Sequence, residues 1–289
     1  MAQTIDFTSC ERVAPRAYNG ANGKKIAVRY EDAVWILKFP ADAHDKPNDL
    51  SYSNSCISEH LGSSIFRILG IPAQETRLGV HVNGKTKLVC ACRDFTSIGV
   101  RLHDFCSIKN TVLDTGSGGS GTELQDILDT IDQQSFLPPD EVRARFWQMF
   151  VVDALIGNFD RHNGNWGFLV NEQTGETHLA PVFDCGSCLL PQADERIMQA
   201  CLTNEAEMNA RIYSFPSSMI KTDGRKIGYY EFLHGTHPQE LDDAVRMLLP
   251  RIKALDIATL IAQTPYLSDL QRTFYTTYLE ARRKHLFEE

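Results

Sequence analysis

The chain has 289 residues, of which 43% are hydrophobic and 23% are charged, and its formal net charge is −8. These values are ordinary for a globular enzyme with one large domain or two lobes. The negative charge argues against general binding to nucleic acids or anionic membranes, because both need a basic surface. No apolar run approaches the ~20 residues of a membrane span, and the first residues lack a signal-peptide pattern. We therefore expect a cytoplasmic protein that binds neither nucleic acid nor membrane, with export without a cleaved signal left open.

The first third of the chain has the pattern of a small β-rich lobe, placed at residues 1–98. Strands are predicted at 25–30, 33–39, 75–82 and 87–92. Glu31-Asp32 can turn the first pair, and Asn83-Gly84 is a strong hairpin signal for the second. Between the pairs, the apolar residues of 55–69 recur at helical spacing, and Gly70 supplies a stop.

The second part, placed at residues 99–289, is predicted to be mostly helical. Its expected helices span 122–134, 138–156 and several segments beyond 206, the last at 268–287, and short strands are expected near 167–170 and 178–183. Thr122 and Gln125 can form a capping box for the first helix. The glycine-rich segment 114–121 is interpreted as a flexible surface linker.

The eight cysteines are interpreted as reduced, buried thiols, because a chain of this length does not need disulfide staples. Cys185 and Cys188 have C-x-x-C spacing, which raises the alternatives of a zinc or a redox site. A structural zinc site normally needs a second ligand pair at similar spacing, and Cys90-Ala-Cys92 is too closely spaced to supply it.

Three polar residues carry the strongest chemical signal. Asp160 and Asn165 have the spacing D-x-x-x-x-N, and Asp184 is followed two residues later by Gly186. Phosphoryl transfer uses one carboxylate to orient or deprotonate a hydroxyl, and an amide oxygen with a second carboxylate to hold Mg²⁺. We therefore predict that Asp160 is catalytic and that Asn165 and Asp184 bind Mg²⁺, the hard ion that oxygen ligands suit.

The neighbours of Asp160 leave alternatives open. His162 is a catalytic candidate that either stabilises developing charge or binds the loop backbone. Arg161 either pairs with a carboxylate or contacts the transferred phosphate, and we favour the pairing. Asn158 and Asn163 are also consistent with simple turn formation.

The nucleotide site is predicted from residues upstream. Lys38 lies on an apolar strand, as does the kinase lysine that holds the α- and β-phosphates, and Glu59 on the next helix is its expected partner. The alternatives are a solvent-facing lysine and an exposed glutamate. Gly20, Gly23 and Lys24 form a loop whose N–H groups could approach phosphate or make an ordinary hairpin turn.

These motifs resemble those of the bacterial HipA-type serine/threonine kinases over about residues 15–255. The segment 158–165 is similar to their N-x-D-R-H-x-x-N loop, 36–40 to their I-x-K-[FP]-P strand, and 20–24 to their glycine loop ending in lysine. The segment 88–95 resembles the strand that leads into the hinge, which implies nucleotide contacts for Cys92 and Asp94. The D-R-H-N run is also similar to that of phosphoinositide 3-kinases.

The resemblance implies an α+β, two-lobed, protein-kinase-like fold of the HipA and phosphoinositide-kinase branch, with a β-rich N-lobe and a larger helical C-lobe. It implies transfer of the γ-phosphoryl group of ATP to Ser or Thr of a protein, with Mg²⁺, and autophosphorylation. Because Lys38 comes so early, we expect no room for the extra N-terminal domain of full-length HipA. The glycine loop has no Ser or Thr, so other acceptors such as Ser51, Ser53 or Ser55 are candidates. The sequence indicates no oligomeric state.

Two alternatives differ in what they require. A phosphoinositide kinase needs a basic patch near the catalytic loop, and the segment 189–207 after Asp184 holds only Arg196. A nucleotide-binding pseudokinase is expected to lack at least one of the four motif residues, and all four are present: Lys38, Asp160, Asn165 and Asp184. The protein kinase is therefore the favoured interpretation.

Overall fold

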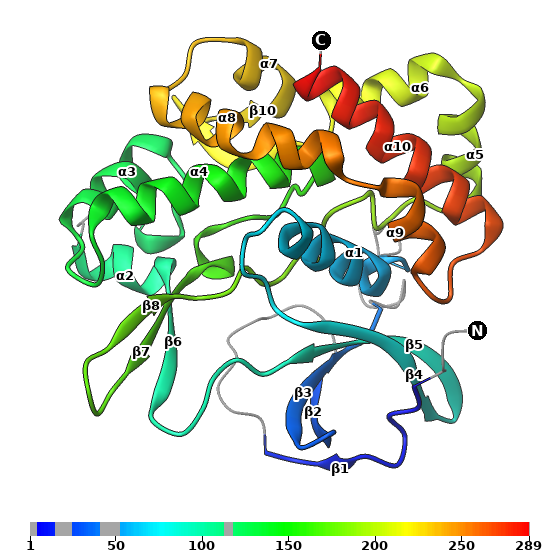
Figure 1. Cartoon of the computed structure of the whole chain (residues 1–289), viewed down its shortest axis with the longest axis horizontal. Helices are drawn as coiled ribbons and strands as arrows, with labels where there is room; N and C mark the ends of the chain where they lie inside the picture. Colours follow the sequence, from blue (N-terminus) through cyan, green and yellow to red (C-terminus); the bar gives the residue numbers. More distant parts are fainter. Residues whose placement is uncertain (1–4, 15–24, 41–52, 113–117, 289) are drawn as a thin grey trace.

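The computed structural model has a strand-rich lobe and a larger helical lobe (Figure 1). It describes residues 5–14, 25–40, 53–112 and 118–288. The α+β fold class predicted from the sequence, with a β-rich N-lobe and a larger helical C-lobe, is confirmed by this arrangement.

The small lobe is an antiparallel sheet of five strands in the order β1-β2-β3-β5-β4, covered by one helix. The elements are β1 (Glu11–Arg12), β2 (Lys25–Tyr30), β3 (Ala33–Lys38), α1 (Ser55–Ile68), β4 (Thr76–Asn83) and β5 (Lys85–Arg93). Glu31 and Asp32 both have positive φ in the β2–β3 turn, as a two-residue hairpin turn requires. The alternating pattern buries Trp35 and Leu37 on one face of the sheet, which leaves Lys38 on the face that α1 covers.

The large lobe combines twelve helical segments of varied length with two small sheets among the described residues. They are β6 (Val100–Asp104), α2 (Phe105–Val112), η1 (Gly118–Ser120), α3 (Leu124–Gln133), α4 (Pro139–Ile156), η2 (Asn163–Asn165), β7 (Gly167–Asn171), β8 (Thr177–Leu179), α5 (Glu195–Thr203), α6 (Glu205–Asn209), η3 (Ala210–Ser214), β9 (Ser217–Thr222), β10 (Arg225–Gly228), α7 (Tyr229–His234), α8 (Gln239–Ala254), α9 (Ile257–Gln263) and α10 (Asp269–Phe287). Strands β6, β7 and β8 form one antiparallel sheet, and β9 and β10 form a separate hairpin.

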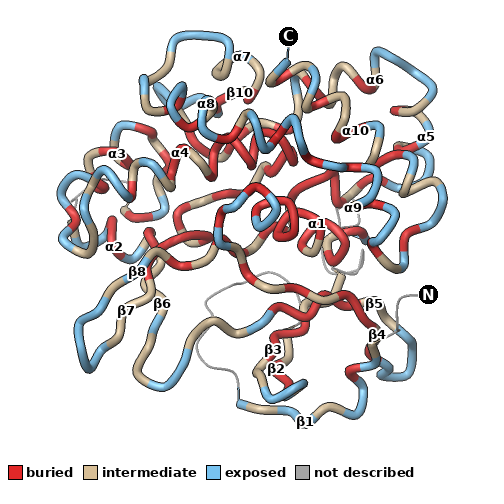
Figure 2. Tube along the Cα trace, in the orientation of Figure 1, coloured by how far each residue is buried: buried red, intermediate tan, exposed pale blue. Residues whose placement is uncertain are grey.

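Helix α4 is the centre of the large lobe, packed between α1, α3, α8 and α10. Every side chain from Met149 to Ile156 is buried, on all sides of the helix, which is typical of a core helix. Figure 2 shows burial concentrated along α1 and α4 in the middle of the molecule. Within the described residues, no helix is both long and apolar enough to cross a bilayer.

Three local predictions are wrong. Thr122 does not cap α3, because its hydroxyl donates to the carbonyl of Met219 at 2.7 Å and the N-cap is Glu123, without a side-chain bond. The expected strand 178–183 ends at Leu179. The region beyond residue 206, predicted as helices with breaks, contains the β9–β10 hairpin, whose turn at Asp223-Gly224 has positive φ at both residues.

All eight cysteines are free thiols in the structure, and six of them are buried. Burial raises the pKa of Cys185 to about 12, so this thiol is protonated and weakly nucleophilic at neutral pH. Among the described residues, no group of three or more His, Cys, Asp or Glu side chains is placed to hold a metal ion.

A buried arginine fixes the end of α4. The Arg282 guanidinium, fully buried on α10, donates to the carbonyls of Ala154 and Leu155 at 3.0 and 3.2 Å, and to that of Arg211 at 2.8 Å. These are among the carbonyls that a helix leaves without an intrahelical partner, and a cation there also interacts favourably with the helix dipole. Arg282 therefore stabilises the C-terminal end of α4, directly before the loop begins.

We predict that Arg282→Met lowers the free energy of unfolding by about 3 kcal/mol, because buried carbonyls lose charge-assisted hydrogen bonds. Urea denaturation of the purified variant measures this loss. Arg246→Met is the control, since Arg246 is 73% exposed beside Asp243 and should change stability by less than about 0.5 kcal/mol. Equal losses in the two variants would show that Arg282 has no special structural role.

Candidate active site

The loop that carries Asp160 begins where α4 ends. Gly157 takes the left-handed conformation (φ 62°) at the C-cap of α4. A Cβ at this position would lie 2.5 Å from the Tyr278 hydroxyl and 2.7 Å from Pro216, so both the backbone angle and the space require glycine. The chain then enters the polar loop 158–165 directly from the most buried helix of the molecule.

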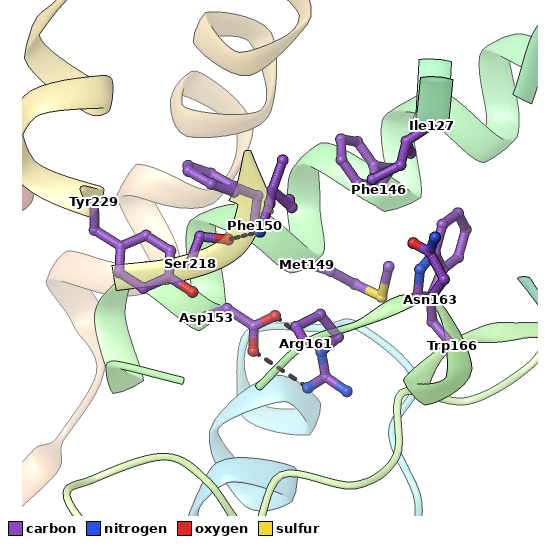
Figure 3. A pocket seen from close by; sticks show the side chains of 11 residues that line it. Ile127, Phe146, Met149, Phe150, Asp153, Arg161, Asn163, Trp166, Ser218 and Tyr229 are labelled. Atoms are coloured by element: carbon purple, nitrogen blue, oxygen red, sulfur yellow. Dashed lines mark hydrogen bonds and ion pairs between the residues drawn. The ribbon is translucent and has the colours of Figure 1, made fainter. Parts of the chain in front are cut away.

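Arg161 anchors this loop to the core (Figure 3). Its Nε lies 2.9 Å from Asp153 Oδ2, and both side chains are at least 95% buried. A second guanidinium nitrogen donates to the carbonyl of Asn165 at 3.0 Å and to the carbonyl of Phe183. One side chain thus joins the last residue of the loop to the residue before Asp184.

This geometry confirms the structural pairing that we favoured for Arg161. Burial alone would lower the pKa of Arg161, but the adjacent Asp153 carboxylate outweighs it and holds that pKa well above its ordinary value. Arg161 is therefore a permanent cation that orders backbone, and it is occupied by protein groups.

Asn158 and Asn163 also hold the loop in place. The amide of Asn158 donates to Asp153 Oδ1 at 2.8 Å, its oxygen accepts from the Asp160 N–H at 3.1 Å, and its carbonyl accepts from the Tyr229 hydroxyl. These bonds fix the backbone at Asp160 from two sides.

Asn163 reaches the glycine-rich segment. Its amide donates to the carbonyls of Gly119 and Gly121 at 2.7 and 2.8 Å. A Cβ at Gly119 would lie 1.9 Å from the Cys106 carbonyl oxygen, so only glycine fits there. The linker interpretation of 114–121 is therefore wrong for 118–121, which packs against the polar loop 158–165; residues 113–117 lie outside the described residues.

Asn165 and Asp160 are bound to each other through the backbone. The Asn165 amide nitrogen donates to the Asp160 carbonyl at 2.9 Å, which leaves the amide oxygen as the free ligand atom of this side chain. Burial raises the pKa of Asp160, and the nearby charge of Asp184 adds to this shift, while His162 opposes it. The two carboxylates therefore lie close enough for the charge of one to affect the proton affinity of the other.

Lys38, Glu59 and Asp184 meet where the two lobes face each other. Lys38 Nζ lies 2.9 Å from Glu59 Oε2 and 2.9 Å from Asp184 Oδ1. Glu59 is 1% exposed, so the expected Lys38–Glu59 pair is present and the exposed-glutamate alternative is wrong. Burial opposes the charge of Lys38, but the two carboxylates outweigh it and raise its pKa well above the ordinary value.

Asp184 is held in an unusual backbone conformation. Its φ is +59°, a left-handed angle that Asp tolerates better than most residues and that is common at functional sites. The next N–H, of Cys185, donates to Glu59 Oε1 at 3.1 Å. The charge of Lys38 lowers the pKa of Asp184 to about 2, so this carboxylate remains ionised while Asp160 has the higher proton affinity.

The remaining predicted site residues are placed as follows. His162 Nδ1 accepts from the Gly164 N–H at 3.1 Å, which is the backbone-binding alternative, and its catalytic role stays a prediction. Cys92 is fully buried on β5 with its sulfur 4.0 Å from that of Cys90. The Asp94 carboxylate accepts from the N–H and hydroxyl of Thr96 at 2.8 and 2.6 Å. The nucleotide contacts of Cys92 and Asp94 stay predictions, and Gly20, Gly23 and Lys24 lie outside the described residues.

Sequence reasoning missed Asp153 and Tyr229, the two partners that fix the loop. A signal for Asp153 was present, because a lone carboxylate stands in the apolar run Val151-Val-Asp-Ala-Leu-Ile156. Since buried charges are normally paired, that aspartate indicated a cationic partner. No comparable local signal pointed to Tyr229.

We predict that Asp153→Asn lowers the free energy of unfolding by roughly 3 kcal/mol or more, because Arg161 is left as an unpaired buried cation. Chemical denaturation measures it. Asp132→Asn is the matched control, since Asp132 pairs with Arg143 at the surface with a carboxylate that is 48% exposed. That control should lose no more than about 1 kcal/mol. A loss for Asp153→Asn as small as the control's would contradict the anchoring role.

Comparison with known proteins agrees with this geometry. The HipA-like C-terminal domain family matches residues 17–254. The serine/threonine-protein kinase CtkA of Helicobacter pylori is 44% identical over 289 residues, which cover 99% of this chain and 87% of the relative. The crystal structure of CtkA, described as a proinflammatory kinase of that organism, superposes with a TM-score of 0.90 at 43% identity, covering 99% of this chain and 96% of the other. The chain therefore belongs to the family with the HipA-like C-terminal domain, and it is a protein kinase.

Proposed function

We propose that this kinase transfers the γ-phosphoryl group of ATP to a Ser or Thr hydroxyl of a protein in a Mg²⁺-dependent reaction. The observation that carries the proposal is the arrangement around Arg161. One buried guanidinium joins the carbonyls of Asn165 and Phe183, and so ties the Asp160 loop to Asp184. The sequence relative that is a serine/threonine-protein kinase supports the same reaction class.

The donor atoms fit a magnesium ion. Asn165 has an amide oxygen left free by its own backbone bond, and the Asp184 carboxylate is 38% exposed, with Oδ1 on Lys38. Oxygen ligands from one or two side chains, completed by phosphate and water, are what Mg²⁺ uses in kinase sites. Bound there, the ion would neutralise negative charge that develops on the phosphate oxygens.

The residues of the chain have separate roles in this proposal. Lys38, kept charged by Glu59 and Asp184, offers a cation to the α- and β-phosphates. Asp160 accepts a hydrogen bond from the acceptor hydroxyl and aligns its oxygen with the γ-phosphorus. The bond from that oxygen to phosphorus forms as the bond to the leaving ADP oxygen breaks, and the hydroxyl proton passes to Asp160. The raised pKa of Asp160 favours this proton transfer.

We also propose autophosphorylation. Ser53 is exposed just before α1, and Ser55 is the first residue of that helix, whereas Ser51 lies outside the described residues. Phosphate at a helix N-terminus interacts favourably with the helix dipole. Mass spectrometry after incubation with Mg²⁺ and ATP tests this assignment.

We predict that Asp160→Asn keeps ATP binding but lowers kcat by about 100-fold or more, because an amide cannot accept the proton of the hydroxyl. Calorimetry with a nonhydrolysable ATP analogue measures binding, and phosphate transfer to a Ser peptide measures turnover. Turnover within a few-fold of the unmodified enzyme would remove Asp160 from its proposed role.

We predict that Asp184→Asn weakens binding of Mg²⁺-ATP by about tenfold, because the site loses the negative charge that would attract the ion. Asn is the appropriate replacement, since it resembles Asp in shape and tolerates the left-handed φ. Affinity for the analogue is compared with Mg²⁺ and with EDTA. An unchanged difference between the two conditions would exclude Asp184 as a metal ligand.

A further inference from the structure

The β9–β10 hairpin (residues 217–228) carries a pair of lysines that the proposed chemistry does not use. Lys221 and Lys226 are directly opposite each other across the antiparallel ladder. Their strands bury Ser218, Ile220 and Ile227, so by alternation both lysines lie on the face turned away from the core. We call them the lysine pair.

The lysine pair lowers the stability of the folded hairpin. Like charges directly opposite on a ladder destabilise it. Within the described residues, neither lysine forms an ion pair with a carboxylate, although the chain as a whole has a net charge of −8. Arg225 adds another exposed cation beside Lys226. Carboxylates near the lysine pair are Asp223 in the turn and Glu123, which forms a β-bridge with Lys221 and whose Oε1 accepts from the Gly224 N–H at 3.0 Å.

The hairpin is fixed at its base to the polar loop 158–165 and toward its tip to Thr122. At its base, the Tyr229 hydroxyl donates to the Asn158 carbonyl, and Ser218 lines the same small cavity as Asp153 and Arg161 (Figure 3). Toward its tip, the Lys221 N–H donates to the Thr122 carbonyl at 2.8 Å. Thr122 directly follows Gly121, whose carbonyl Asn163 binds. The hairpin therefore has a defined position beside Asp160, and the charge of Lys226 lowers the pKa of that carboxylate, although burial dominates its shift.

We propose that the lysine pair binds acidic side chains close to the acceptor Ser or Thr of a protein substrate. This inference rests on the proposed function and adds a substrate class to it. Two lysines on the outer face of the hairpin, one partly exposed and one exposed, have no ion-pair partner among the described residues, and they attract carboxylates a few residues from the acceptor. Such complementarity directs partner choice and steers association.

A protein segment is favoured over a phosphoinositide headgroup. A lipid substrate also needs contact with the bilayer surface, which apolar side chains around the basic site would provide. The large hydrophobic side chains that the described residues expose are Ile68, Val82, Ile98, Met247 and Tyr266, and none of them lies on the hairpin. The sequence relative named above is a kinase of proteins.

The test uses three Ser peptides of equal length, flanked by Glu, by Gln or by Arg, with the full-length enzyme, Mg²⁺ and ATP. The unmodified enzyme should use the Glu peptide with a kcat/KM roughly tenfold above that of the Gln peptide, because exposed charge pairs contribute a modest attraction. The preference should appear as a lower KM for the Glu peptide than for the Gln peptide, with the same KM for ATP. It should become smaller at high ionic strength.

The decisive variant is Lys226→Glu, which places opposite charges across the ladder. It should be at least as stable as the unmodified chain in a thermal melt, so a folding defect is not expected, and it should lose the preference for the Glu peptide. Lys253→Glu is the matched control, because Lys253 is exposed on α8 without an ion-pair partner among the described residues. The control should keep the preference.

The outcomes separate the two proposals. Equal use of the three peptides by the unmodified enzyme, or an unchanged preference in Lys226→Glu, would overturn the substrate inference while leaving the kinase proposal intact. Phosphate transfer to phosphoinositide vesicles and to none of the peptides would overturn it in favour of a lipid substrate. Absence of transfer to any substrate, including the enzyme itself, would reject the proposed function.

Discussion

The buried ion pair between Arg161 and Asp153 is the interaction on which the rest of the site depends. Helix α4 supplies the carboxylate from the core, and the loop supplies the guanidinium, which in turn holds the carbonyls of Asn165 and Phe183. Taking two charges out of water is costly, and a hydrophobic pair of the same volume often matches or exceeds such a pair in stability. Its value here is geometric, because planar guanidinium donors fix three separate segments at defined distances.

A second set of ion pairs links the two lobes in the same way. Lys38 on the small lobe contacts Glu59 on α1 and Asp184 from the large lobe, each at 2.9 Å. One cation between two carboxylates leaves local negative charge in excess, which suits a site that would hold a divalent ion, and it gives Asp184 a low pKa. Asp160 is partly buried, has no cation in contact among the described residues, and has a raised pKa instead, chiefly through burial. Two carboxylates in one site thus have different proton affinities because their environments differ.

The predictable elements are those in which a local pattern and the tertiary packing agree. Strands β2 to β5 of the small lobe, α1, α4 and the last helix follow from alternation, helical periodicity and the glycine that ends α4, whereas the two-residue β1 was not predicted. The failures have a different origin. Thr122 had the sequence of a helix cap, but its hydroxyl bonds to Met219, 97 positions along the chain. The β9–β10 hairpin was missed because its strands are short and its partners, Thr122 and the polar loop 158–165, are distant in sequence.

By itself, the sequence determined the chemistry of the site: the order and spacing of Lys38, Glu59, Asp160, Asn165 and Asp184 indicated phosphoryl transfer, because few reactions need those groups in that arrangement. Only the tertiary structure decided which groups hold them. The partner of Arg161, the close packing of Gly119 and the position of the lysine pair depend on contacts between segments far apart in the chain. Such contacts are selected by the packing of whole elements, and no local pattern of residues encodes them.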